Sequence, residues 1–125
     1  MLYESMETAK KMRYILNMSP VLNKDAMFSD GTEYYRTPVE PREGDTVTIR
    51  FRTQRNNVDN VCLVYDGEYL EMKWEKTSGS FDYYTAQIVM GKNLVRYYFE
   101  IHSGLVTCYY DTNGVSTRHE GKDRI

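Results

Sequence analysis

Aromatic residues with polar neighbours are the part of this sequence best suited to bind a ligand. They gather in three runs in the second half of the chain, namely Phe81–Tyr84, Val95–Ile101 and Cys108–Tyr110. Aromatic and β-branched side chains suit the pleated surface of a strand, so we expect three successive strands here. Because side chains in a strand alternate between its two faces, some of these tyrosines must point outward.

The same alternation divides the two longer runs into an inward and an outward set. The inward set is expected to be Tyr84, Ala86, Ile88, Val95, Tyr97, Phe99 and Ile101. The outward set is then Tyr83, Thr85, Gln87, Arg96, Tyr98 and Glu100. We expect Tyr83 and Tyr98 to share one exposed sheet surface or its rim, with Trp74 of the preceding strand nearby.

An exposed aromatic ring can stack on the axial C–H face of a sugar, while polar neighbours bond the sugar hydroxyls. The stacking candidates are Trp74, Tyr83 and Tyr98, and the candidate hydroxyl partners are Asp82, Gln87 and Arg96. Trp74 is the strongest of them, because it lies outside the densest aromatic run. The alternative for any one tyrosine is ordinary cross-strand pairing, which stabilises a sheet by about 0.2–1 kcal/mol per pair.

Composition excludes several classes of partner. A chain of 125 residues with 41% hydrophobic and 27% charged residues is typical of one soluble domain. The net charge of −2 argues against nucleic acid, although Arg50, Arg52 and Arg55 accompany aromatic residues. No run approaches the roughly 20 apolar residues of a membrane span. Residues Met1–Met18 lack the apolar core of a secretory signal, so we expect a cytoplasmic location, unless an export signal has been removed.

Catalytic and metal-binding patterns are missing from the sequence. His102 and His119 are expected in a hairpin loop and a polar tail, where a histidine is usually just solvated, and no nucleophile elbow, phosphate loop or zinc motif occurs. Asp111–Gly114 resembles the start of a calcium loop but lacks the closing glutamate, so a turn is expected. We therefore expect no catalytic residues, no metal and no cofactor.

Cys62 and Cys108 are expected as two free thiols, although a disulfide bridge between them stays an open alternative.

The remaining elements must position these aromatics, and most of them are predicted as strands. Thr46–Arg52 alternates strictly between apolar and polar residues, Val58–Tyr65 follows it, and Asp66-Gly67 predicts a tight hairpin into Tyr69–Trp74. Turn signals recur about every 8–12 residues, which favours an all-β, antiparallel sandwich of seven to eight strands. Three segments carry weaker expectations: a helix over Ser5–Lys11, a strand over Tyr14–Met18, and a tail from Gly114 to Ile125.

Four motifs in this order resemble a known module. They are Ile49-Arg50-Phe51-Arg52-Thr53, Val61-x-Leu63-Val64-Tyr65-Asp66-Gly67, Phe81-Asp82-Tyr83-Tyr84-x-Ala86 and Arg96-Tyr97-Tyr98-Phe99-Glu100-Ile101. The module is the N-terminal immunoglobulin-like domain of neopullulanase, cyclomaltodextrinase and maltogenic amylase type enzymes. These enzymes belong to glycoside hydrolase family 13, and the module is classed as carbohydrate-binding module family 34. The resemblance runs from about Tyr14 to Ser116. Family members often have Trp at the position of Tyr84, and the segment between Pro20 and Glu43 is longer here.

The resemblance implies a noncatalytic module over residues 1–116, with residues 117–125 as a linker towards a catalytic barrel that this sequence does not contain. Its implied partners are an α-glucan (starch, a maltooligosaccharide or a cyclodextrin) or the parent enzyme's barrel, in some members within a homodimer. The first hypothesis is therefore an α-glucan-binding module. The second is a structural dimerisation or interdomain module without sugar affinity, and the third is an adhesion sandwich unrelated to glycans.

Overall fold

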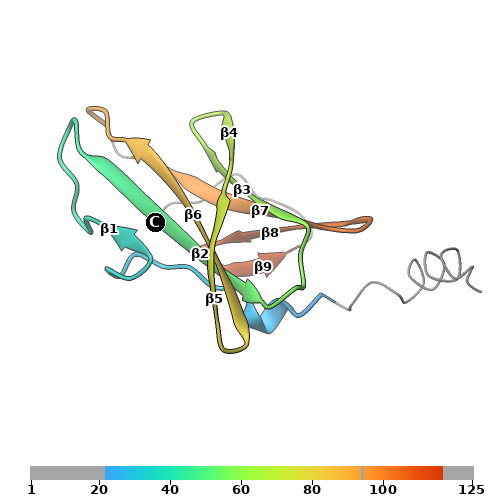
Figure 1. Ribbon diagram of the computed structural model, residues 1–125. Coiled ribbons are helices and arrows are strands. Elements are labelled where there is room, and N and C mark those ends of the chain that lie inside the picture. The colour runs from blue at the N-terminus through green and yellow to red at the C-terminus, as the bar shows by residue number, and fades with distance from the viewer. Residues whose placement is uncertain (1–21, 94, 117–125) are drawn as a thin grey trace, which may run out of the picture.

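The computed structural model describes residues 22–93 and 95–116, which form a sandwich of two antiparallel sheets (Figure 1). The four-stranded sheet has the order β1 (Arg36–Thr37), β2 (Thr46–Gln54), β6 (Phe81–Val89) and β5 (Lys73–Ser78). The five-stranded sheet has the order β4 (Glu68–Glu71), β3 (Asn60–Tyr65), β7 (Tyr97–Ser103), β8 (Val106–Asp111) and β9 (Gly114–Ser116). The all-β, immunoglobulin-like fold class is confirmed.

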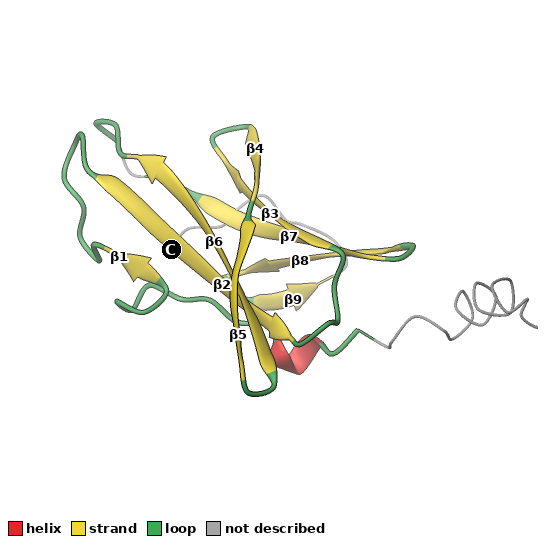
Figure 2. Cartoon of the chain, in the orientation of Figure 1, coloured by secondary structure: helices red, strands yellow, loops and turns green. Residues whose placement is uncertain are grey.

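The structure describes nine strands and a single 3-10 turn, η2 (Lys24–Ala26), within these residue ranges (Figure 2). None of the helices in the described part of the chain is long and apolar enough to cross a membrane. The expectations for Ser5–Lys11, Tyr14–Met18 and the linker at 117–125 lie outside the described residues.

The hydrophobic core forms where the inward residues of the two central strand pairs meet. In β2 the predicted alternation is confirmed, because Val47, Ile49 and Phe51 are buried while the residues between them are half-buried. In β7, Tyr97, Phe99 and Ile101 are buried as predicted. The rings of Phe51 and Phe99 lie 4.5 Å apart between centroids, so one aromatic contact joins the two sheets. Period-two patterning thus predicted which face of each strand is buried.

The β3–β4 hairpin confirms the turn predicted at Asp66-Gly67. Both residues have positive φ, 47° at Asp66 and 78° at Gly67. A two-residue hairpin of this kind needs positive φ at both central positions, which glycine tolerates freely and aspartate better than most residues. The predicted turn at Asp111–Gly114 is also confirmed, because Asp111 pairs with Gly114 and its side chain accepts a hydrogen bond from the Asn113 N–H at 2.8 Å.

Two strand predictions were wrong in their boundaries. Tyr69–Trp74 is not one strand, because the chain leaves the five-stranded sheet after Glu71 and enters the four-stranded sheet at Lys73. Met72 lies at this crossing and is only 4% exposed, so its side chain is anchored in the core. The tail expected from Gly114 instead begins with strand β9, which pairs with β8.

We expect the core to be sensitive to the loss of a single buried isopropyl group. Val61→Ala should lower the free energy of unfolding by about 2–3 kcal/mol, because Val61 is 0% exposed and the change removes buried methyl groups and leaves a cavity. Val89→Ala is the matched control, since Val89 is 68% exposed on β6, and should cost less than about 1 kcal/mol. Urea unfolding followed by far-UV circular dichroism measures both. Equal losses would contradict this placement of the core.

Candidate functional site

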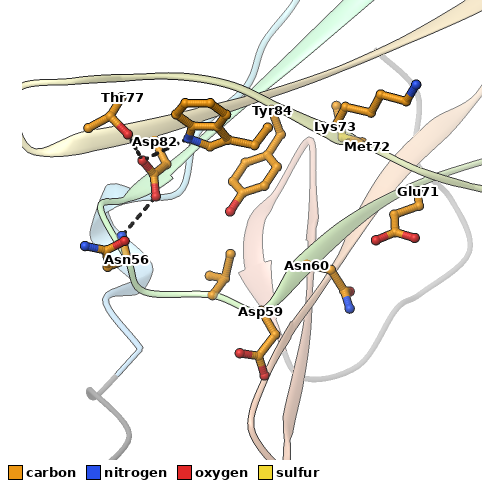
Figure 3. A pocket seen from close by; sticks show the side chains of 11 residues that line it. Asn56, Asp59, Asn60, Glu71, Met72, Lys73, Thr77, Asp82 and Tyr84 are labelled. Atoms are coloured by element: carbon orange, nitrogen blue, oxygen red, sulfur yellow. Dashed lines mark hydrogen bonds between the residues drawn. The ribbon is translucent and has the colours of Figure 1, made fainter.

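A cleft opens at the edge of the sandwich where the chain crosses from β4 to β5. Its volume is about 670 Å³, which lies in the range of pockets that hold small organic ligands. Its walls come from the segment before β3, the crossing itself, and strands β5 and β6 (Figure 3). The lining residues are Asn56, Val58, Asp59, Asn60, Glu71, Met72, Lys73, Trp74, Thr77, Asp82 and Tyr84.

Trp74, the single tryptophan of the chain, lies on the cleft side of the four-stranded sheet. It pairs directly with Tyr84 across the β5–β6 ladder, and directly paired residues of an antiparallel sheet share a face. A β-bulge between Trp74 and Lys76 shifts the register, so that Lys76 pairs with Tyr83 instead. Trp74 is 58% exposed, and much of its side chain is therefore available to a ligand.

Asp82 holds the indole of Trp74 in position. Its Oδ1 accepts hydrogen bonds from Trp74 Nε1, at 3.3 Å, and from the Thr77 hydroxyl. Its Oδ2 accepts the backbone N–H of Asn56 at 2.9 Å, and these contacts appear as dashed lines in Figure 3. Asp82 is 5% exposed, so a carboxylate proposed from the sequence as a sugar-hydroxyl partner is instead already occupied by protein donors.

The charge of Asp82 is stabilised by these donors. Burial alone raises the pKa of this carboxyl group, but the hydrogen bonds from Thr77, the Asn56 N–H and Trp74, with the positive charge of Arg55, hold the pKa below its ordinary value of 3.8. Asp82 is therefore ionised at neutral pH. A buried carboxylate with several donors is a rigid anchor for the residues that donate to it.

Tyr84 is a cleft residue that the sequence reasoning placed in the core. It is half-buried and packs against the core cluster, which agrees with its predicted inward direction. Its hydroxyl points into the space between β6 and the segment at Asp59 (Figure 3). Burial, followed by the negative charges of Asp82 and Asp59, raises the pKa of Tyr84 above its ordinary value, so the hydroxyl keeps its proton. Alternation gives a core residue and a cleft residue the same inward direction, so the sequence pattern does not separate the two.

The predicted shared surface of Tyr83 and Tyr98 is wrong. Tyr83 lies on β6 in the four-stranded sheet, whereas Tyr98 lies on β7 in the five-stranded sheet. Both point away from the core, so they occupy opposite outer faces of the sandwich. Trp74 lies on a third surface, the cleft. The error arose because adjacent strands in the sequence were taken to be neighbours in one sheet, whereas β6 and β7 belong to different sheets.

Tyr83 takes part in an aromatic cluster on the outer face of the four-stranded sheet. Its ring meets that of Tyr34 edge to face, with centroids 5.7 Å apart, and the ammonium of Lys76 lies 5.5 Å from both rings. The guanidinium of Arg50 lies 4.4 Å from the Tyr34 ring and binds both carboxylate oxygens of Glu75, at 2.8 and 2.9 Å. These contacts engage Tyr83 and Tyr34 with protein groups; Lys76 is the cross-strand partner of Tyr83, whereas Tyr34 reaches it from the turn before β1.

The other predicted contact residues lie away from the cleft. Gln87 is exposed on β6 and donates from its side-chain amide to the Thr48 hydroxyl at 3.3 Å. Arg96 is exposed immediately before β7. Tyr98 packs its ring 6.2 Å from that of Tyr109. The structure therefore brings together Trp74 and Asp82 from the predicted set and leaves the remainder elsewhere.

One histidine and both cysteines lie in strands of the part of the chain that the structure describes. His102 lies in β7 rather than in the loop, with Nε2 2.9 Å from Glu100 and Nδ1 3.2 Å from the Thr107 hydroxyl. Cys62 and Cys108 are free thiols, as expected. No group of three or more metal-ligating side chains occurs within residues 22–93 and 95–116.

Replacing the anchor carboxylate should change how stability depends on pH. Because the folded-state pKa of Asp82 is lowered, its charge stabilises the fold above the unfolded-state pKa, and this contribution is lost as pH falls through the folded-state value. Asp82→Asn should lower the free energy of unfolding by about 1–3 kcal/mol near neutral pH, because an amide replaces a carboxylate that accepts hydrogen bonds from three donors. The difference in the free energy of unfolding between the wild-type and variant proteins should shrink as pH falls from about 5 downwards.

Urea unfolding at several pH values, followed by the fluorescence of Trp74, measures this effect. Asp66→Asn is the matched control, because Asp66 is exposed in a turn where asparagine also accepts positive φ. A difference in stability that stayed constant across this pH range would contradict the anchoring role of the Asp82 charge.

Comparisons with known proteins agree with this architecture. A cyclomaltodextrinase structure superposes with a TM-score of 0.68 and 19% identity over 78% of this chain. The structure of a maltogenic amylase from S. marinus superposes with a TM-score of 0.62 and 15% identity over 75% of this chain. At these identities the similarity establishes the fold. The aligned part of each relative is only 18% and 13% of its own length, respectively.

The match between this sequence and a protein family is stronger evidence of relationship than the structural superpositions. Residues 22–124 match the family described as alpha amylase, N-terminal ig-like domain, a span that includes both sheets and the cleft. The match is to the immunoglobulin-like domain and not to a catalytic domain. The chain therefore belongs to the family of N-terminal immunoglobulin-like domains of alpha amylases.

Proposed function

We propose that this chain is the noncatalytic N-terminal module of an alpha-amylase-family glycoside hydrolase and that it binds starch-like α-glucans in the Trp74 cleft. One observation carries the proposal: an exposed tryptophan lies directly across from a half-buried tyrosine in an open cleft, and a buried carboxylate fixes its indole. The kinship with alpha-amylase N-terminal domains supplies the ligand class.

The chemistry of the cleft suits a sugar chain. The face of an indole packs against the apolar face of a pyranose ring, which lets hydroxyls point towards the sides. Asn56, Asp59 and Asn60 line the cleft and offer side-chain oxygen or nitrogen atoms to such hydroxyls. Because Asp82 already fixes the indole, little conformational freedom of Trp74 is lost when a ligand binds.

A titration of the chain with maltoheptaose tests the proposal. Trp74 is the only tryptophan, so its fluorescence reports directly on the cleft and should change in a saturable manner. Trp74→Ala should weaken binding measured by calorimetry at least about tenfold, or about 1.4 kcal/mol, because it removes the stacking surface. Tyr69→Ala is the matched control, since Tyr69 is 64% exposed on neighbouring β4 but does not line the cleft, and should retain wild-type affinity.

Absence of both a fluorescence change and binding heat at millimolar maltoheptaose would refute the proposed function. Binding that survives Trp74→Ala but is lost in Tyr83→Ala or Tyr98→Ala would instead move the site to one of the outer faces.

A second candidate function, a structural contact with another domain or with a second copy, is favoured by one feature. The tip of the β7–β8 hairpin exposes Leu105 at 97% and Val106 at 47%. This tip is also held in place, because the Gly104 N–H donates to Asp59 Oδ2 at 2.6 Å and the Ser103 hydroxyl donates to the Asn57 carbonyl at 3.0 Å. A fixed apolar tip is typical of contact surfaces between proteins.

Sedimentation velocity at increasing protein concentration tests the dimer form of this second function. The wild-type chain should show a rising sedimentation coefficient, and Leu105→Ser should abolish the rise while changing the free energy of unfolding by less than about 0.5 kcal/mol. Val89→Ser, at another exposed apolar position, is the control. A wild-type chain that stays monomeric throughout would remove the dimer form of this candidate.

A further inference from the structure

The charged side chains that line the cleft come from four elements. Asp59 precedes β3, Glu71 ends β4, Lys73 begins β5, and Asp82 lies in β6. Carboxylates therefore outnumber ammonium groups, and none of the lining residues is an arginine. The balance of charge on the walls is negative.

These charged side chains differ in how many protein groups they already bind and in how exposed they are. Asp82 is buried, accepts hydrogen bonds from Thr77, Trp74 and Asn56, and interacts with the positive charge of Arg55. Glu71 and Lys73, in contrast, are exposed to solvent.

The remaining groups favour hydroxyl donors as ligands. In Figure 3 the ammonium of Lys73 points away from Tyr84, and the carboxylate of Asp59 lies on the far side of its own backbone segment from the hydroxyl of Tyr84. One Asp59 oxygen accepts the Gly104 N–H at 2.6 Å, which holds this carboxylate in place. The lining thus contains more carboxylates than ammonium groups, and its one ammonium group points away from Tyr84.

We propose that the cleft selects uncharged α-glucan segments and rejects glucans that carry phosphate or carboxylate groups, with Asp59 and Glu71 as the residues that set this preference. The inference rests on the proposed function and names the class of glucan within it. Sugar hydroxyls donate hydrogen bonds to carboxylates, whereas a phosphate ester carries a charge of about −1.5 to −2 and only accepts. Binding a phosphate favourably needs arginine, lysine or clustered N–H groups aimed at it.

Coulomb's law sets the expected size of the preference. In water at low ionic strength, repulsion between a phosphate group and one carboxylate about 7 Å away should lower the affinity of the phosphorylated glucan for the cleft about fivefold. The repulsion extends over about 10 Å at 0.1 M salt and about 3 Å at 1 M salt. The discrimination should therefore be clear at low salt and weak at high salt.

Calorimetric titrations of the intact chain with maltoheptaose and with a 6-phosphate ester of maltoheptaose test this inference. At low salt we expect the neutral sugar to bind at least about tenfold more tightly, from the combined effect of Asp59 and Glu71. At about 1 M sodium chloride the ratio of the two affinities should fall several-fold.

A pair of matched variants identifies the source of the preference. Glu71→Gln keeps the size of the side chain and an acceptor oxygen but removes its charge, so it should lower the ratio of the maltoheptaose affinity to the phosphate-ester affinity about fivefold. Glu68→Gln is the control, because Glu68 is also exposed on β4 but does not line the cleft, and it should change neither affinity.

The outcomes separate the inference from the proposed function. If both sugars bind equally well at low salt, or if the preference does not respond to salt or to Glu71→Gln, the inference is overturned and the proposed function stands. If neither sugar binds, the proposed function is overturned and the inference falls with it.

Discussion

The contact between the two sheets, centred on the rings of Phe51 and Phe99, is the interaction on which the fold depends. It joins β2 of one sheet to β7 of the other, with the ring of Tyr110 5.4 Å from Phe51 and that of Tyr97 5.8 Å from Phe99. Burial of these large rings provides much of the driving force that a sandwich of this size needs. It also fixes how the strand ends approach one another at the open edges of the sandwich.

The cleft is a consequence of how the chain passes between those sheets. Met72 is buried at the crossing from β4 to β5, so the backbone there cannot move away from the core. This places the start of β5, including Trp74, beside the beginning of β3 and its preceding segment. The bulge in β5 follows the Trp74–Tyr84 pair and shifts the register, so that Lys76 pairs with Tyr83 and Thr77 pairs with Asp82. Strand alternation in β6 separates Tyr84, on the cleft side, from Tyr83, on the outer face.

The aromatic residues of this protein fall into groups with different roles. The rings in the core stabilise the sandwich, and those on the outer face of the four-stranded sheet are engaged by cations, for example Arg50 over Tyr34. Trp74 differs from both groups because most of its side chain is exposed while its polar atom is bonded to a buried carboxylate. An exposed and fixed ring is a better stacking surface than an exposed and mobile one, since less entropy is lost on binding.

The amino-acid sequence by itself determined the fold class, the inward residues of β2, β6 and β7, and the turn at Asp66-Gly67. These are local properties, because alternation and turn chemistry depend on residues a few positions apart. Sequence reasoning also placed Trp74 and Asp82 among the candidates. Only the tertiary structure decided that Asp82 anchors the indole, that Tyr84 lines the cleft, and that Tyr83 and Tyr98 lie on opposite faces. Those facts depend on which sheet each strand joins, where the chain crosses at Met72 and where β5 bulges, and hydrophobic periodicity does not encode the choice of strand neighbours.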